Sequence, residues 1–130
     1  MKLTRTERGW GAHHILGSRC RFRRNTLLEF DDIKIVVSTV GLAENLARKD
    51  QAVTPEELFD PVAGLGSYFE TMAFHALSED NRYHDIDVCR SVSFESPCHI
   101  AEIDADDKAN DMHERVVTEL GTRLVQGMRL

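Results

Sequence analysis

The stretch TLLEFDDIKIVVSTV, residues 26–40, decides the fold of the N-terminal half of this chain. It contains two runs rich in β-branched and aliphatic residues, 26–30 and 33–40, with Asp31 and Asp32 between them. Two turn-prone residues between two such runs are typical of a β-hairpin, although Asp-Asp is a weaker turn sequence than Asp-Gly. The sequence therefore predicts an antiparallel pair of strands here.

The residues that precede this hairpin are extended in character. The apolar stretch 10–16 is flanked by glycines, and residues 19–22 also fit an extended conformation. Asn25 favours a turn before the hairpin. We therefore expect strands over about residues 10–40.

Residues 41–66 interrupt the strand pattern. Residues 42–47 fit one or two helical turns, and Thr54 with Pro55 and a glutamate at the third helical position predicts a short helix that ends near residue 60. We expect a long loop with a short helix over 41–66, and a connection of this length in a small domain is usually functional or mobile.

A second hairpin is predicted over about residues 68–94. In 86–94, apolar and polar residues alternate with a period of two that only Arg90 interrupts, which indicates a strand. The run 68–77 fits either a helical stripe or a strand. We favour the strand because a turn-prone cluster, 78–81, separates the two runs.

The C-terminal part predicts one long helix over about residues 106–126, with Gly127 as its stop. Its apolar residues recur at spacings of three and four: Ala109, Met112, Val116, Leu120 and Leu124. This stripe must be buried, and a sheet is the only large surface available to it. The predicted fold is therefore α+β: a curved antiparallel β-sheet or small partly open barrel built from hairpins, with the C-terminal helix packed on it.

Length and composition are those of a globular protein with a single domain over residues 1–130. Of its 130 residues, 42% are hydrophobic and 29% charged, which excludes a disordered chain. The net charge of -6 is unevenly distributed: residues 1–24 carry seven basic residues and one acidic residue, a net +6, and the remainder carries 9 basic and 21 acidic residues, a net -12.

The sequence predicts a cytoplasmic protein. The first residues are charged and no apolar signal segment follows them, and no apolar run is long enough for a membrane span, so we expect no membrane association. The three cysteines, Cys20, Cys89 and Cys98, are odd in number, which favours reduced thiols over a disulfide framework.

Four arginines form the strongest candidate binding surface. Arg19, Arg21 and Arg23 alternate along one expected strand, which would place their side chains on one face, and Arg24 adds to them. Such a row suits phosphates or another anionic partner. The alternative that we favour is pairing with the protein's own carboxylates, such as those of the C-terminal helix.

An acidic cluster at the start of the predicted helix is a weaker candidate for a metal site. Asp107, Asp111 and Glu114 would share one helix face and could ligate a divalent cation, but the spacing fails that of an EF-hand loop. We favour a solvated helix face with an N-terminal cap, and the sequence predicts no metal and no cofactor.

Histidines and cysteines offer only weak catalytic candidates. His13, His84 and Asp85 could form an acid–base site beneath the 41–66 loop, since a carboxylate can orient a histidine. No zinc-ligand spacing, nucleophile elbow or phosphate-binding loop occurs in the chain.

Four short segments have a distinctive residue pattern: RGWG at 8–11, FRRNTLL at 22–28, YFETM at 68–72 and DADDKA at 104–109. Together they resemble a family of small uncharacterised bacterial and prophage-type proteins. The resemblance spans most of the chain and implies no activity, cofactor or catalytic residue.

Two functions follow as hypotheses. The first is a non-enzymatic binding or accessory module that associates with a protein partner or with itself as a homodimer through a sheet edge, with nucleic acid as a less favoured partner. The second is a small hydrolase or metal-dependent enzyme with the histidine–carboxylate site named above. The lack of a catalytic motif favours the first.

Overall fold

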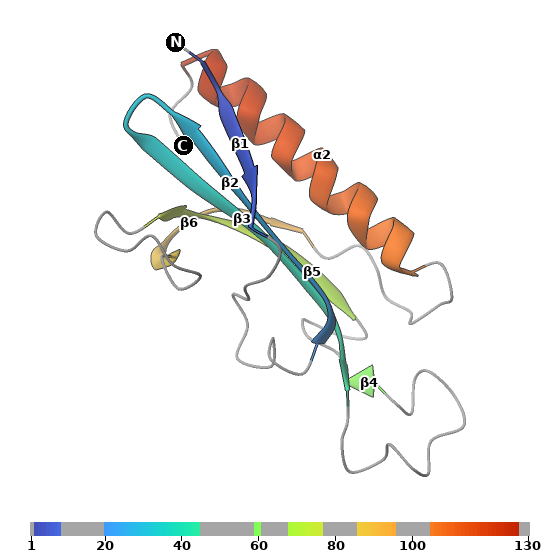
Figure 1. The fold of residues 1–130 in the computed structure, drawn as a ribbon. Helices are drawn as coiled ribbons and strands as arrows, with labels where there is room; N and C mark the ends of the chain where they lie inside the picture. Colours follow the sequence, from blue (N-terminus) through green and yellow to red (C-terminus); the bar gives the residue numbers. More distant parts are fainter. Residues whose placement is uncertain are drawn as a thin grey trace.

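A curved, open antiparallel sheet with one long helix packed on it forms the fold (Figure 1). The computed structural model describes residues 2–8, 20–44, 59–60, 68–76, 86–95 and 105–127. Its elements are β1 (Thr4–Glu7), β2 (Cys20–Phe30), β3 (Ile33–Glu44), β4 (Phe59–Asp60), β5 (Phe69–Ala76), β6 (Ile86–Glu95) and α2 (Ala105–Val125). The strand order is β1-β2-β3-β5-β6, and β4 pairs with the end of β3. The predicted α+β class is confirmed.

The predicted hairpin over residues 26–40 is present as β2 and β3. Phe30 pairs with Ile33 across the two-residue turn, and Asp31 has a φ of 58°, a left-handed conformation that aspartate tolerates better than most residues. Val36, Ser38 and Val40 are as fully buried as the helix-facing side chains of β3. Burial on both faces explains why this strand is apolar without alternation.

Both strands are longer than the sequence predicts. The turn expected at Asn25 is wrong: Asn25 lies inside β2 opposite Ser38, fully buried, and its carbonyl accepts a hydrogen bond from the Arg8 amide at 2.8 Å. The helical turns expected over 42–47 are wrong for residues 42–44, which continue β3. Pairing with β2, which extends to Cys20 opposite Ala43, overrides local propensity at these positions.

β1 and β4 are strands that the sequence analysis did not predict. The four side chains of β1 are all exposed and polar, so no apolar alternation marks the strand. Phe59 and Asp60 form β4, which corrects the short helix predicted to end near residue 60. The predicted strand 10–16 and residues 54–58 of that helix lie outside the described residues.

The second predicted hairpin is confirmed as β5 and β6. Their pairing joins Thr71 to Glu95 and Ala76 to Ile86, and the register shifts beside Phe74. Such a shift is typical of a β-bulge, which increases the twist of a sheet.

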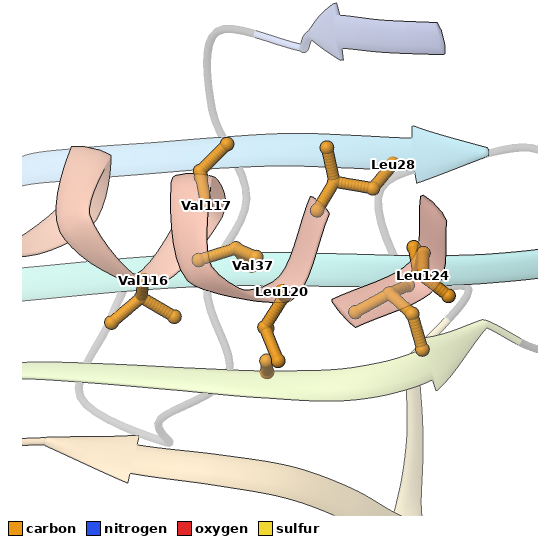
Figure 2. Close-up of a cluster of buried hydrophobic side chains, with 8 residues drawn as sticks. Leu28, Val37, Val116, Val117, Leu120 and Leu124 are labelled. Atoms are coloured by element: carbon orange, nitrogen blue, oxygen red, sulfur yellow. The ribbon is translucent and has the colours of Figure 1, made fainter. Parts of the chain in front are cut away.

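Helix α2 buries the predicted stripe against β2, β3 and β5. Figure 2 shows Val116, Leu120 and Leu124 of α2 lying over the sheet, close to Leu28 of β2 and Val37 of β3, with Leu120 reaching over β5. Each large aliphatic side chain buried in this way contributes about 1.5–3 kcal/mol to stability. The helix ends as predicted: Gly127 has a φ of 73°, and its amide donates to the Leu124 carbonyl at 3.0 Å.

Among the described residues, no helix combines the length and apolarity needed to cross a membrane.

Candidate functional site

A buried polar cluster lies between α2 and the sheet. His113, on the sheet-facing side of α2, has no exposed surface. Its Nε2 lies 2.7 Å from Thr26 Oγ1 on β2, and its Nδ1 lies 2.7 Å from Thr39 Oγ1 on β3. Thr39 Oγ1 in turn lies 2.6 Å from Thr71 Oγ1 on β5. One side chain of the helix is thus connected to three neighbouring strands.

The hydrogen bonds of this cluster have one consistent direction. Thr26 donates its only hydroxyl proton to Glu7 Oε2 at 2.8 Å. His113 Nε2 must therefore carry a proton and donate to Thr26, which leaves Nδ1 to accept from Thr39. Since Thr39 then has no proton left, Thr71 donates to Thr39. The neutral Nε2–H tautomer of His113 therefore gives every group in this series of hydrogen bonds a partner.

Electrostatics favour the same neutral form. Burial lowers the pKa of His113 to about 4, and the nearby positive charge of Arg24 acts in the same direction. At neutral pH the cluster is therefore an uncharged histidine linked to one carboxylate, that of Glu7.

An ionic cluster borders these buried groups at the surface. The guanidinium of Arg24 binds Glu7 at 2.7 Å and Glu114 at 3.0 Å. Arg5 holds both carboxylate oxygens of Glu114, at 2.8 and 2.6 Å. These contacts lower the pKa of Glu114 to about 2, with the hydrogen bond from Arg5 as the main cause. Burial raises the pKa of Glu7, but hydrogen bonds from Arg24 and Thr26 outweigh it, and the pKa lies below its usual value.

The geometry assigns His113 a structural role. A ring without solvent exposure, with both nitrogens already hydrogen-bonded, offers no atom to a substrate. A fully satisfied buried network instead fixes the position of the helix on the sheet.

An apolar groove lies beside the ionic cluster, between β1 and α2. It encloses about 440 Å³, with Leu28 and Val117 among its apolar walls. Polar groups from both elements contribute to its lining: Arg5, Thr118, Thr122 and Gln126. Val125, which is 56% exposed, also lines it and is the one exposed large hydrophobic residue among those whose side chains the structure describes.

The structure separates the four arginines singled out in the sequence. Arg23 is exposed, whereas Arg24 lies on the helix-facing side of β2 in the ionic cluster. Arg19 and the side chain of Arg21 lie outside the described part of the chain. The pairing of sheet arginines with helix carboxylates therefore occurs, through Arg24 and Arg5. Binding of an anionic partner at Arg19, Arg21, Arg23 and Arg24 stays a prediction.

The metal candidates do not come together in a cluster. Asp107 and Asp111 are exposed on α2, while Glu114 is held by two arginines. The described residues contain no group of three or more histidines, cysteines or carboxylates that could hold a metal ion. The acid–base candidates His13, His84 and Asp85 lie outside the described ranges.

The cluster of His113 and its three threonines was not predicted from the sequence. The one sequence feature that indicates burial of His113 is its position: it falls beside Met112 and three residues before Val116, on the apolar stripe of the helix. Comparison with known proteins adds no further assignment, since no family model, curated protein or solved structure matches the chain.

Proposed function

We propose that this protein is a non-enzymatic binding module, and that the groove between β1 and α2 is its site for a small amphipathic ligand. The observation that carries the proposal is the groove itself. Its volume of about 440 Å³ falls within the range of sites that accommodate small molecules, and its lining combines an apolar majority with a few polar groups.

The chemistry of the lining indicates the class of ligand. Leu3, Leu28 and Val117 offer apolar contact to the body of a ligand. Among the described residues of the lining, Arg5 is the one that carries a charge. Because Glu114 and Glu7 already balance that charge, Arg5 offers a ligand hydrogen-bond donors rather than net positive charge, so a ligand with a polar head group that accepts hydrogen bonds suits this site.

At the buried cluster, binding is favoured over catalysis because His113 is closed to solvent. The alternative, a small hydrolase or metal-dependent enzyme that uses His13, His84 and Asp85, has no separate support in the described residues and stays a hypothesis from the sequence. The cytoplasmic location and bacterial origin are likewise predictions from the sequence.

The fluorescent probe anilinonaphthalene sulfonate, an apolar molecule with an anionic head, tests the proposal. We expect saturable binding of one probe per chain to the wild-type protein. Thr118 is exposed and lines the groove, so Thr118→Trp should fill the site and weaken binding at least about tenfold.

A matched control distinguishes the groove from general surface binding. Glu119→Trp places the same indole on the next residue of α2, which does not line the groove, and should leave probe affinity unchanged. Equal binding by both variants, or no saturable binding by the wild type, would refute the proposed site.

A further inference from the structure

β1 is the last strand at one end of the sheet formed by the described strands. The Arg8 amide donates to the Asn25 carbonyl at 2.8 Å, which places Arg8 in a hydrogen-bonded pair with β2. In an antiparallel ladder such pairs alternate, so Thr6 and Thr4 also direct their backbone groups towards β2. The N–H and C=O groups of Arg5 and Glu7 therefore point out of the sheet edge.

We propose that a second copy of this chain adds to that edge, with the two β1 strands antiparallel about a two-fold axis at Thr6. Arg5 then lies opposite the partner's Glu7, and Glu7 lies opposite the partner's Arg5. This inference concerns the strand edge and does not rest on ligand binding in the groove.

Backbone geometry limits the register. Only Arg5 and Glu7 in β1 direct their hydrogen-bonding groups outwards, so a ladder must pair these positions with each other. The three registers that do so place Arg5 opposite Arg5, Glu7 opposite Glu7, or Arg5 opposite Glu7.

Charge selects among these three registers. Like charges directly opposite each other on one sheet face are destabilising, and opposite charges are favourable. The first two registers oppose like charges at the axis, whereas the third forms two opposite-charge pairs. The sequence Thr-Arg-Thr-Glu of β1 is thus complementary to itself in one register.

The proposed pair is also compatible with the rest of the fold. Arg5 and Glu7 already belong to a cluster with Arg24 and Glu114 in which two positive and two negative groups balance. Two such clusters meet without net repulsion. The two-fold axis places both α2 helices on the same face of the combined sheet, so the two grooves face each other across it.

Because exposed ion pairs contribute little to affinity, the charges define the register while the backbone ladder supplies the contact.

Sedimentation equilibrium of the full chain tests for the dimer. We expect a concentration-dependent monomer–dimer equilibrium for the wild type. Thr6→Lys, which places two like charges at the axis, should weaken dimerisation at least about tenfold, whereas Thr6→Ser should not. Thr6 is exposed, so neither change should affect the fold, and circular dichroism checks this. A wild type that stays monomeric at the highest concentration overturns the proposal.

Disulfide trapping tests the register. In the proposed pair, Thr6 faces the partner's Thr6 at a non-hydrogen-bonded position, where Cα atoms lie about 4.5 Å apart, within disulfide range. Mild oxidation of Thr6→Cys should therefore give a covalent dimer that the wild type does not form. Thr4→Cys is the matched control: Thr4 is exposed on the same strand but lies too far from its symmetry mate to be bridged. Trapping through residue 4, or no trapping through residue 6, overturns the register.

Discussion

At the scale of single residues, His113 explains how a polar group can lie in the centre of this core. Its two ring nitrogens and the hydroxyls of Thr26 and Thr39 satisfy one another, and among the described residues the charged group that hydrogen-bonds to them is the carboxylate of Glu7. An unpaired buried polar group costs about 1–3 kcal/mol, so these partners depend on each other.

A double-mutant cycle tests that dependence. His113→Leu and Thr39→Val should each lower the free energy of unfolding by about 1–3 kcal/mol, because each leaves a buried polar partner unsatisfied. The double variant replaces both partners with apolar groups, so its loss should be smaller than the sum of the two by about 1 kcal/mol or more. Urea unfolding measures all three.

The control pair is His113→Leu with Thr118→Val. Thr118 is exposed on α2, lines the groove and takes no part in the hydrogen bonds of this cluster, so its effect should add to that of His113→Leu. Additive losses for His113 and Thr39 as well would show that the cluster is not coupled.

At the scale of elements, β3 depends on one glycine. Gly41 lies between Phe22 on β2 and Phe69 on β5, and the two rings meet edge to face with centroids 5.7 Å apart. A Cβ at Gly41 would lie only 2.0 Å from Cδ1 of Phe69, a fully buried side chain. The ring of Phe69 therefore occupies the space that any larger residue at position 41 would need.

We expect Gly41→Ala to lower the free energy of unfolding by about 1–3 kcal/mol, because the Phe69 ring must move within a packed core. Gly121→Ala is the matched control. Among the described residues its Cβ would meet the flexible end of Leu3, at 3.0 Å, and alanine is favoured over glycine within a helix by about 1 kcal/mol. Thermal unfolding should show a lower Tm for the first variant and an unchanged or higher Tm for the second; equal effects would contradict this account.

At the scale of the whole molecule, the uneven charge of the chain is partly resolved within the fold. Arg5 and Arg24 come from the basic first 24 residues, and both contact Glu114 of the acidic remainder. These contacts join β1 and β2 to α2 at the edge of the core.

The stability of the whole molecule should depend on pH through His113. Its folded pKa of about 4 lies below the ordinary value of 6.5, so the unfolded chain binds the proton more readily. The stability that depends on a neutral His113 is fully present above pH 6.5 and is lost as the pH falls towards 4. From pH 7.5 to 4.5 the loss amounts to roughly 2.5 kcal/mol. The carboxylates of Glu7 and Glu114, whose pKa values are lowered, add a second loss only below about pH 4.5.

Urea unfolding at several pH values separates these contributions. The difference in stability between wild type and His113→Leu should shrink steadily from pH 7.5 to 4.5, because the variant lacks the titrating group. The other histidines are present in both proteins and cancel in the difference. A difference that does not change with pH would exclude His113 as the source.

The sequence by itself determined the local elements with strong periodicity. The hairpin about Asp31, the strand alternation of 86–94 and the stripe of α2 each follow from side chains a few residues apart, and the α+β class follows from the need to bury that stripe. Asn25 shows the limit, since its turn propensity yields to pairing with β3.

Only the tertiary structure decided the sites. His113 meets Thr26 across 87 positions of the chain, and Arg5 meets Glu114 across 109. No periodicity connects residues so far apart, and β1 itself has no apolar pattern from which to predict a strand. Local patterns depend on neighbours along the chain, whereas the buried cluster, the groove and the self-complementary edge depend on which surfaces the fold brings together.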